Sequence, residues 1–222
     1  IKTVIMAGGK GTRMKPFTDV LPKPLIPIKG EPIIEHIIQR FQRYGCNDFF
    51  LTINYKGSLL KAYFEELNPD YNIDFIEEEK FLGTAGSLSI LKDKFDLESP
   101  FFVTNCDIII KKDYNKIYNF HLEQNYDLTL IASAKQYLIP YGTCELNSDG
   151  HLQKINEKPS YDFLVNTGLY VINPDLLKFI PKSTFFHITD LIELAIEKEK
   201  KIGVFPVEDD SWIDIGQWKE YK

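Results

Sequence analysis

A glycine-rich segment with two positive charges stands near the start of the chain. Residues 4–14 read VIMAGGKGTRM, in which three glycines follow an apolar run. Backbone amides without a neighbouring Cβ can approach phosphate oxygens closely, and Lys10 and Arg13 add positive charge. The segment is not a P-loop, because Gly11 follows Lys10, and it is not a GxGxxG fingerprint, because Met14 takes the third glycine position. We predict a phosphate-binding loop of another kind; the alternative is a structural turn between a strand and a helix.

Asp107 and Asp214 lie far apart in the sequence and could act together only if the fold brings them close. Asp107 lies just beyond the apolar run Phe101–Val103, at the expected carboxyl end of a strand, and Asp214 lies in the segment WIDIG. Two carboxylates brought together would suit Mg²⁺, a hard cation that prefers oxygen ligands. Taken singly, each aspartate is more commonly a turn or helix-capping residue. The cysteines and histidines show no spacing typical of metal ligands.

Composition and charge narrow the class of protein. The chain has 222 residues, of which 44% are hydrophobic and 26% charged, values typical of a soluble globular protein with one large domain. Its net charge of -6 argues against general nucleic-acid binding. No apolar run approaches the roughly 18 residues that a membrane span needs. The cysteines read as free thiols in a reducing compartment. We expect a cytoplasmic protein with neither nucleic acid nor a membrane among its partners.

The elements that must position these residues alternate between strand and helix patterns. Strands are predicted at Thr3–Met6, Asp48–Ile53, Ile73–Ile76, Pro100–Thr104 and Asp127–Ala132. Helices are predicted at Pro32–Tyr44, Ser58–Leu67, Thr84–Leu91 and Tyr114–Gln124. This βαβα rhythm predicts an α/β fold with a doubly wound, mostly parallel, Rossmann-like sheet that is covered on both faces.

The pattern changes after Ala132. Extended runs at Thr143–Leu146, Leu152–Ile155 and Val165–Ile172 predict a small antiparallel insertion, and Asn147–Gly150 is a good turn. Two helices and a last strand follow, at Pro174–Phe179, Ile188–Lys198 and Ile202–Pro206. Ligands of such sheets bind beyond the carboxyl ends of the strands. The loops after Met6, Ile76, Thr104 and Ile155 are therefore expected to face one cleft.

Short motifs in a fixed order identify the family that the chain resembles. They are AGGKGTR at residues 7–13, PKP at 22–24, LGTAG at 82–86, NCD at 105–107, YG at 141–142, EKP at 157–159, NTGLY at 166–170 and WIDIG at 212–216. Together they resemble the signature of the sugar-1-phosphate nucleotidylyltransferases, along nearly the whole chain. The resemblance implies attack by a sugar-1-phosphate oxygen on the α-phosphorus of a nucleoside triphosphate (NTP), with release of pyrophosphate.

The resemblance also implies roles for single residues. Arg13 and Lys23 would clamp the triphosphate and the departing pyrophosphate, and Lys158 would neutralise charge at the sugar phosphate and the α-phosphate. Asp107 and Asp214 would hold Mg²⁺ as the cofactor. The nucleotide would contact Ala7, Gly8, Gly9, Gly11, Thr12, Glu78, Gly83, Thr84 and Ala85. The sugar would contact Gly142, Glu157, Asn166, Thr167 and Gly168. Cys106 departs from the pattern, because relatives often carry Gly there, and we expect it to affect only packing.

Glu78 bears on the choice of base. It stands five residues before Gly83, where thymidylyl and uridylyl relatives commonly have Gln. A carboxylate can accept hydrogen bonds from both N1–H and the 2-amino group of guanine. The chain therefore looks most like the guanylyltransferase branch, with GTP as substrate. UTP or dTTP is the alternative, because their bases also carry an N3–H, and Glu77–Glu79 could instead form a solvated acidic loop.

The identity of the sugar and the extent of the chain are less defined. Glucosamine-1-phosphate is favoured over mannose- or heptose-1-phosphate, because some bacterial relatives that use it carry paired ligand-sensing domains upstream, and Ile1 is not an initiator methionine. Residues 1–222 are expected to form a single catalytic domain cut from a longer chain. The final residues, WKEYK, are expected to form a helix, and a homo-oligomer is left open.

Two other functions are compatible with a fold of this class. A glycosyltransferase of similar fold would usually carry a paired-acid DxD motif, whereas NCD has one acid. A nucleotide-sensing subunit without catalysis would not need the full set of Arg13, Lys23, Asp107, Lys158 and Asp214. The sequence therefore favours the nucleotidylyltransferase.

Overall fold

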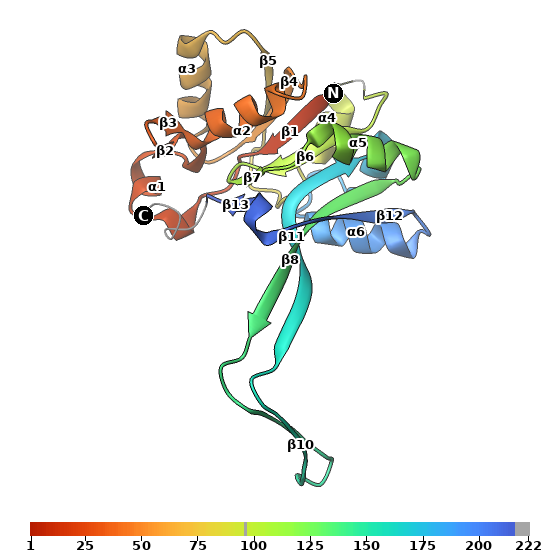
Figure 1. Cartoon of the computed structure of the whole chain (residues 1–222). Coiled ribbons are helices and arrows are strands. Elements are labelled where there is room, and N and C mark those ends of the chain that lie inside the picture. Colours follow the sequence, from red (N-terminus) through yellow and green to blue (C-terminus); the bar gives the residue numbers. More distant parts are fainter. Residues whose placement is uncertain (96, 216–222) are drawn as a thin grey trace.

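The computed structural model, which describes residues 1–95 and 97–215, is built around a seven-stranded sheet (Figure 1). In spatial order the strands are β12 (Ile202–Val207), β8 (Leu128–Leu138), β11 (Ser160–Ile172), β6 (Phe101–Asn105), β1 (Lys2–Met6), β4 (Asp48–Ile53) and β5 (Asn72–Glu77). Strands β6, β1, β4 and β5 pair in parallel, as do β12 and β8, whereas β11 is antiparallel to both of its neighbours. The predicted mostly parallel sheet is confirmed.

Helices cover both faces of the sheet because successive strand residues point to opposite sides. The longer helices are α2 (Ile33–Gln42), α3 (Gly57–Leu67), α4 (Leu88–Lys94), α5 (Tyr114–Glu123) and α6 (Ile188–Glu197). Ile5 and Phe102 lie in one buried cluster with side chains of α2, α3 and α5. Their neighbours Val4 and Val103 lie in the opposite cluster with side chains of α4 and α6. The doubly wound arrangement predicted from the sequence is therefore confirmed.

Strands β8 and β11 continue beyond the sheet as a two-stranded arm (Figure 1). Their pairing runs out to Leu138 opposite Ser160, and the hairpin of β9 (Thr143–Leu146) and β10 (Leu152–Asn156) follows. The predicted antiparallel insertion is confirmed, but both long strands extend further than predicted. The rings of Tyr137 and Phe163 meet across the arm at 5.9 Å between centroids.

Several short elements escaped the sequence prediction. They are α1 (Phe17–Val20), β2 (Pro27–Ile28), β3 (Glu31–Pro32), β7 (Ile108–Ile110), β13 (Trp212–Asp214) and the 3₁₀ turns Thr12–Met14, Lys23–Leu25 and Asp209–Ser211. The predicted helix Pro174–Phe179 is a 3₁₀ helix. The expected C-terminal helix and Gly216 of WIDIG lie outside the described residues.

The helix predicted to start at Thr84 starts at Leu88. The amides of Ala85 and Gly86 donate instead to the carbonyl of Phe186, and the amide of Phe186 donates to the carbonyl of Leu82. These long-range bonds hold residues 82–86 as a loop. No helix within residues 1–95 and 97–215 combines the length and apolarity needed to cross a bilayer.

Candidate active site

A cavity of about 290 Å³ opens beyond the carboxyl ends of β1, β4, β5 and β6. We call it the first cavity. Its lining residues are Met6, Gly8, Gly9, Gly11, Thr12, Arg13, Lys23, Thr52, Glu78, Phe81, Gly83, Thr84, Asn105, Cys106 and Asp107. The loops after Met6, Ile76 and Thr104 thus face one cleft, as predicted. Ala7 and Ala85 are buried behind this surface.

The glycine loop is held by hydrogen bonds to Thr52, and two of its glycines lie too close to neighbouring side chains to carry a Cβ. The amide of Ala7 donates to the carbonyl and the hydroxyl oxygen of Thr52, at 3.1 and 3.2 Å. Gly11 has φ 63°, and a Cβ there would lie 2.9 Å from Thr18 Cγ2. A Cβ on Gly8 would lie 2.7 Å from Glu78 Oε1. Both positions therefore need glycine, for conformation at Gly11 and for close approach at Gly8.

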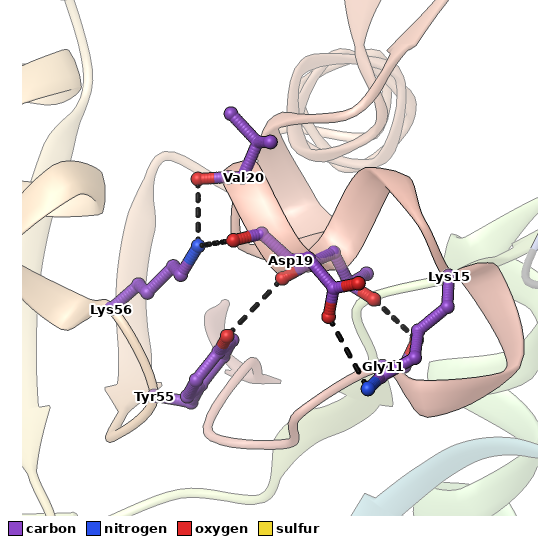
Figure 2. Close-up of polar contacts among 7 residues, drawn as sticks. Gly11, Lys15, Asp19, Val20, Tyr55 and Lys56 are labelled. Atoms are coloured by element: carbon purple, nitrogen blue, oxygen red, sulfur yellow. Dashed lines mark hydrogen bonds and ion pairs between the residues drawn. The ribbon is translucent and has the colours of Figure 1, made fainter.

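Helix α1 contacts this loop through a hydrogen bond (Figure 2). The hydroxyl of Thr18 donates to the carbonyl of Gly11 at 3.1 Å. Lys56, beyond β4, donates to the last carbonyls of α1, those of Asp19 and Val20, at 2.6 and 2.8 Å. Tyr55 donates to the carbonyl of Thr18 at 3.3 Å. The loop is thus tied to the end of the neighbouring strand.

Three charged residues predicted to handle phosphates and metal contact one another in the lining of the first cavity. The ammonium of Lys23 donates to Asp107 Oδ2, and Arg13 Nη2 lies 3.9 Å from the same oxygen. Lys23 is 8% exposed and Asp107 6% exposed, so their charges are largely withdrawn from water. A buried charge needs a partner, and each supplies one for the other.

Asp214 is brought beside Asp107 by a short antiparallel ribbon that the sequence did not reveal. In it β13 pairs with β7, with Asp214 opposite Ile108, and the amide of Ile215 donates to the carbonyl of Asp107 at 2.7 Å. Arg40 holds β7 by donating to the carbonyls of Ile110 and Lys112 at 3.0 and 2.7 Å. The two aspartates therefore lie on adjacent segments, as the metal prediction requires.

A second cavity of about 250 Å³ adjoins the first and shares Arg13, Asn105 and Asp107 with it. Its other lining residues are Ile108, Asn166, Thr167, Gly168, Tyr170, Trp212 and Asp214. Both aspartates border this cavity, and their carboxylate oxygens suit Mg²⁺. Within the described residues no group of three or more His, Cys, Asp or Glu side chains could hold a metal. The remaining ligands would therefore be phosphate oxygens and water.

The predicted sugar residues lie at an irregularity in β11: Asn166 ends one stretch of regular pairing with β8, and Thr167 and Gly168 follow it before pairing resumes at Tyr170. Thr167 donates to the carbonyl of Ile131 at 2.8 Å, and the amide of Gly168 donates to Asn166 Oδ1 at 2.9 Å. Gly168 has φ 89°, and a Cβ there would lie 2.3 Å from Asn105 Nδ2. Burial raises the pKa of Tyr170 to about 12, so its hydroxyl stays neutral.

The structure does not bring Gly142, Glu157 or Lys158 to either cavity. All three lie at the junction of the arm and its hairpin, and Glu157 and Lys158 are exposed. The expectation that the loop after Ile155 shares the cleft is therefore not met in this conformation. Beyond the irregularity in β11, regular pairing from Asn166 opposite Ala132 to Ser160 opposite Leu138 holds these residues on the arm.

Glu78 lies in the first cavity and is only 6% exposed, so the solvated-loop alternative is wrong for this residue. Its Oε2 accepts the amide of Leu82 at 2.8 Å, and its carbonyl accepts Asn54 Nδ2 at 2.7 Å. Burial raises the pKa of Glu78, although the hydrogen bonds from the Leu82 amide and the Thr52 hydroxyl oppose the shift.

Comparison with known proteins identifies the family of the chain. The model of the family described as nucleotidyl transferase matches residues 2–222. The chain belongs to the nucleotidyl transferase family. It is 31% identical over 230 residues to a mannose-1-phosphate guanyltransferase of Schizosaccharomyces pombe, and 32% identical over 232 residues to one of Aspergillus fumigatus. Each alignment covers 100% of this chain and 62% of the relative. The chain thus spans about three fifths of the length of these relatives.

Solved structures agree with the family. HddC from Yersinia pseudotuberculosis superimposes with a TM-score of 0.77 at 26% identity, over 99% of this chain and 96% of that one. A second structure of HddC, complexed with GMP-PN, gives a TM-score of 0.76 at 25% identity, with the same coverage. The motif resemblance found in the sequence is therefore confirmed at the level of the nucleotidyl transferase family, and the two relatives named above are guanyltransferases.

Sequence reasoning missed several residues of the cleft. Met6, Thr52, Phe81 and Asn105 line the first cavity, and Tyr170 and Trp212 line the second. Asn105, Tyr170 and Trp212 belong to the motifs NCD, NTGLY and WIDIG, so their motif position was an available signal. Phe81 carried no signal, because its place at the cavity depends on the contacts of residues 82–86 with Phe186.

Proposed function

We propose that the chain transfers a guanylyl group from GTP to a hexose-1-phosphate, which forms a GDP-sugar and releases pyrophosphate. One observation carries the proposal: the carboxylate of Glu78 lines the same cavity as Arg13, Lys23 and Asp107. Glu78 follows β5 and Asp107 follows β6, and β1 and β4 lie between these two strands, so the carboxylate and the charged group lie at opposite ends of the cavity. A purine nucleoside triphosphate offers donors at its base edge and negative charge at its tail. It therefore complements both ends at once.

In this reaction a phosphate oxygen of the sugar phosphate attacks the α-phosphorus of GTP. The bond from that phosphorus to the bridging oxygen of the β-phosphate breaks, and pyrophosphate leaves with the bonding electrons. Arg13 and Lys23 bind the triphosphate and stabilise the charge that develops on the leaving group, while the amides of the glycine loop orient it. The sugar phosphate lies in the second cavity against Asn166 and Thr167. Mg²⁺ held by Asp107 and Asp214 would supply further neutralisation of phosphate charge.

Mannose-1-phosphate is the first sugar phosphate to test. The relatives with about 31% identity are named mannose-1-phosphate guanyltransferases, which supports it over the glucosamine-1-phosphate favoured by the sequence alone. The decisive assay measures pyrophosphate release with four NTPs against mannose-, glucosamine-, glucose- and heptose-1-phosphate. We expect GTP with mannose-1-phosphate to give the highest rate. Absence of pyrophosphate release from every pair would favour the glycosyltransferase or the sensing subunit.

Glu78→Gln is expected to lower kcat/KM for GTP. The ratio of kcat/KM for GTP to that for the pyrimidine nucleotides should therefore fall. Gln can accept only one of the two guanine hydrogen bonds without turning a donor toward a donor. A buried group left unpaired costs about 1–3 kcal/mol, so the GTP to UTP ratio should fall by about tenfold or more. Glu79→Gln, at the exposed neighbour, is the matched control. An unchanged ratio in Glu78→Gln would remove this residue from base recognition.

Because the pKa of Glu78 is raised, the wild type and Glu78→Gln should also differ in how their use of GTP depends on pH. Only the ionised carboxylate can accept both guanine hydrogens, so GTP use should fall as the pH drops through the pKa of Glu78. Because burial raises this pKa, the fall begins at a higher pH than for an ordinary glutamate. In the Glu78→Gln enzyme, the ratio of kcat/KM for GTP to that for UTP should not show this fall at low pH.

Lys158→Ala is expected to weaken use of the sugar phosphate if the arm bends so that the loop after Ile155 reaches the cleft. Loss of one positioned cation would raise the barrier by roughly 2–4 kcal/mol. Lys154→Ala, on β10 of the same arm and also exposed, is the matched control. Kinetics toward every sugar phosphate should be compared for both variants. Unaltered kinetics in Lys158→Ala would show that the extended arm keeps this lysine out of the reaction.

A further inference from the structure

An exposed aromatic pair lies at the edge of the first cavity. Phe81 lines the cavity and is 42% exposed, and Phe185, 53% exposed, meets it edge to face with 5.9 Å between ring centroids. Phe185 in turn lies edge to face with the ring of His187 at 4.7 Å. Large apolar rings that stay half exposed in the free protein are well suited to cover a planar ligand.

The backbone fixes this pair in place. The amide of Phe186 donates to the carbonyl of Leu82 at 2.8 Å, and the carbonyl of Phe186 accepts the amides of Ala85 and Gly86. A Cβ on Gly83 would lie 2.6 Å from the carbonyl oxygen of Phe186, so the two segments are in close contact. Phe185 therefore stands beside Phe81 because of long-range hydrogen bonds, and the pair is organised before any ligand binds.

Phe81 also shares a short turn with Glu78. The carboxylate of Glu78 accepts the amide of Leu82 at 2.8 Å, which closes the turn that carries Phe81. Both side chains line the same cavity, but Glu78 is buried while Phe81 is half exposed. A carboxylate can bind only the edge of a base, in the plane of its ring. An aromatic side chain beside the same cavity can cover the face.

We propose that Phe81 is the stacking platform for the nucleobase and that Phe185 is a positioning residue that supports its ring. The inference rests on the proposed function only in that the first cavity takes a nucleoside triphosphate. Stacking needs an aromatic face and no particular hydrogen-bond pattern, so Phe81 contributes affinity for any base. It contributes most to purines, whose two fused rings offer the larger face, and it therefore adds to the preference for GTP over UTP.

The test compares binding of GTP, UTP and inorganic triphosphate to Phe81→Leu, Phe81→Trp and the wild-type chain by calorimetry, with Mg²⁺ and without sugar phosphate. Leu keeps the apolar bulk but removes the ring. GTP binding to Phe81→Leu should weaken by about tenfold, UTP binding by less, and binding of inorganic triphosphate, which has no base, should not change. Phe81→Trp should bind GTP at least as well as the wild type. GTP should also quench part of the fluorescence of the tryptophan that this substitution introduces.

Two further variants separate stacking from a structural effect. Phe185→Leu should weaken GTP binding by about threefold and leave triphosphate binding unchanged, because only the support of the ring is lost. Phe163→Leu, a half-exposed phenylalanine on the arm that lines neither cavity, is the control and should match the wild type. Wild-type affinity for GTP in Phe81→Leu overturns the proposal, as does an equal loss for GTP and inorganic triphosphate. Failure of the proposed function would instead show as bound GTP that no sugar phosphate converts to pyrophosphate.

Discussion

Asp214→Asn is expected to lower turnover by roughly two to three orders of magnitude while the fold stays intact. Removal of one carboxylate charge weakens Mg²⁺ binding, and a metal bound to phosphate contributes several kcal/mol to stabilisation of the transition state. Asp107 is in addition the buried partner of Lys23. Its replacement would mix a metal effect with the cost of an unpaired lysine.

The measurement is the initial rate as a function of Mg²⁺ concentration, together with direct binding of Mn²⁺ to the free protein. Asp210→Asn, an exposed aspartate four residues earlier, is the matched control and should leave both unchanged. High Mg²⁺ should recover part of the activity of Asp214→Asn, since the change acts on affinity for the metal. Near-normal turnover of Asp214→Asn at limiting Mg²⁺ would show that the metal is held elsewhere.

The parts of the fold that followed from the sequence are those set by periodic apolar patterns. Strands β1, β4 and β6 alternate between two buried faces, and α2 and α6 present apolar residues at helical spacing. These patterns are local, so they predicted the doubly wound sheet. The ribbon of β7 with β13 was missed, because three-residue strands carry almost no period. The length of the arm was missed because most of its side chains are exposed. Polar and apolar residues do not alternate strictly along it, so the sequence lacks the pattern of a half-buried strand.

For the candidate site, the positions of residues just after predicted strands located the cleft. They did not show which side chains of the cleft contact one another. Glu78, Asp107 and Gly11 follow strands, and parallel strands bring their carboxyl ends to one edge. The sequence could not show that Lys23 bonds to Asp107, or that Phe81 stands at the cavity, because both depend on contacts between segments far apart in the chain. Motif position alone placed Lys158 near the phosphates, and the structure leaves that residue on the arm.

Lys23→Met is expected to change catalysis and metal binding in opposite directions. Lys23 donates to the carboxylate that is proposed to hold Mg²⁺, so the two charges neutralise each other. Triphosphate must draw the lysine away before Asp107 can bind metal without competition. Without the ammonium group, Asp107 should bind Mn²⁺ more tightly in the absence of nucleotide. Turnover should nevertheless fall by about 30- to 1000-fold in both reaction directions, the equivalent of roughly 2–4 kcal/mol for a lost preorganised contact to phosphate.

Lys15→Met is the matched control for this prediction. Lys15 also stands near the glycine loop, but it pairs with Asp19 at 3.3 Å and its side chain is 61% exposed. It should change neither turnover nor Mn²⁺ binding beyond the small effect of one distant charge. If Lys23 served only to stabilise the folded chain, Lys23→Met would melt at a lower temperature yet keep its KM for pyrophosphate. Tighter Mn²⁺ binding combined with a loss of pyrophosphate use in Lys23→Met, and in neither respect in Lys15→Met, is the result expected if the Lys23 ammonium group binds Asp107 without nucleotide and phosphate with it.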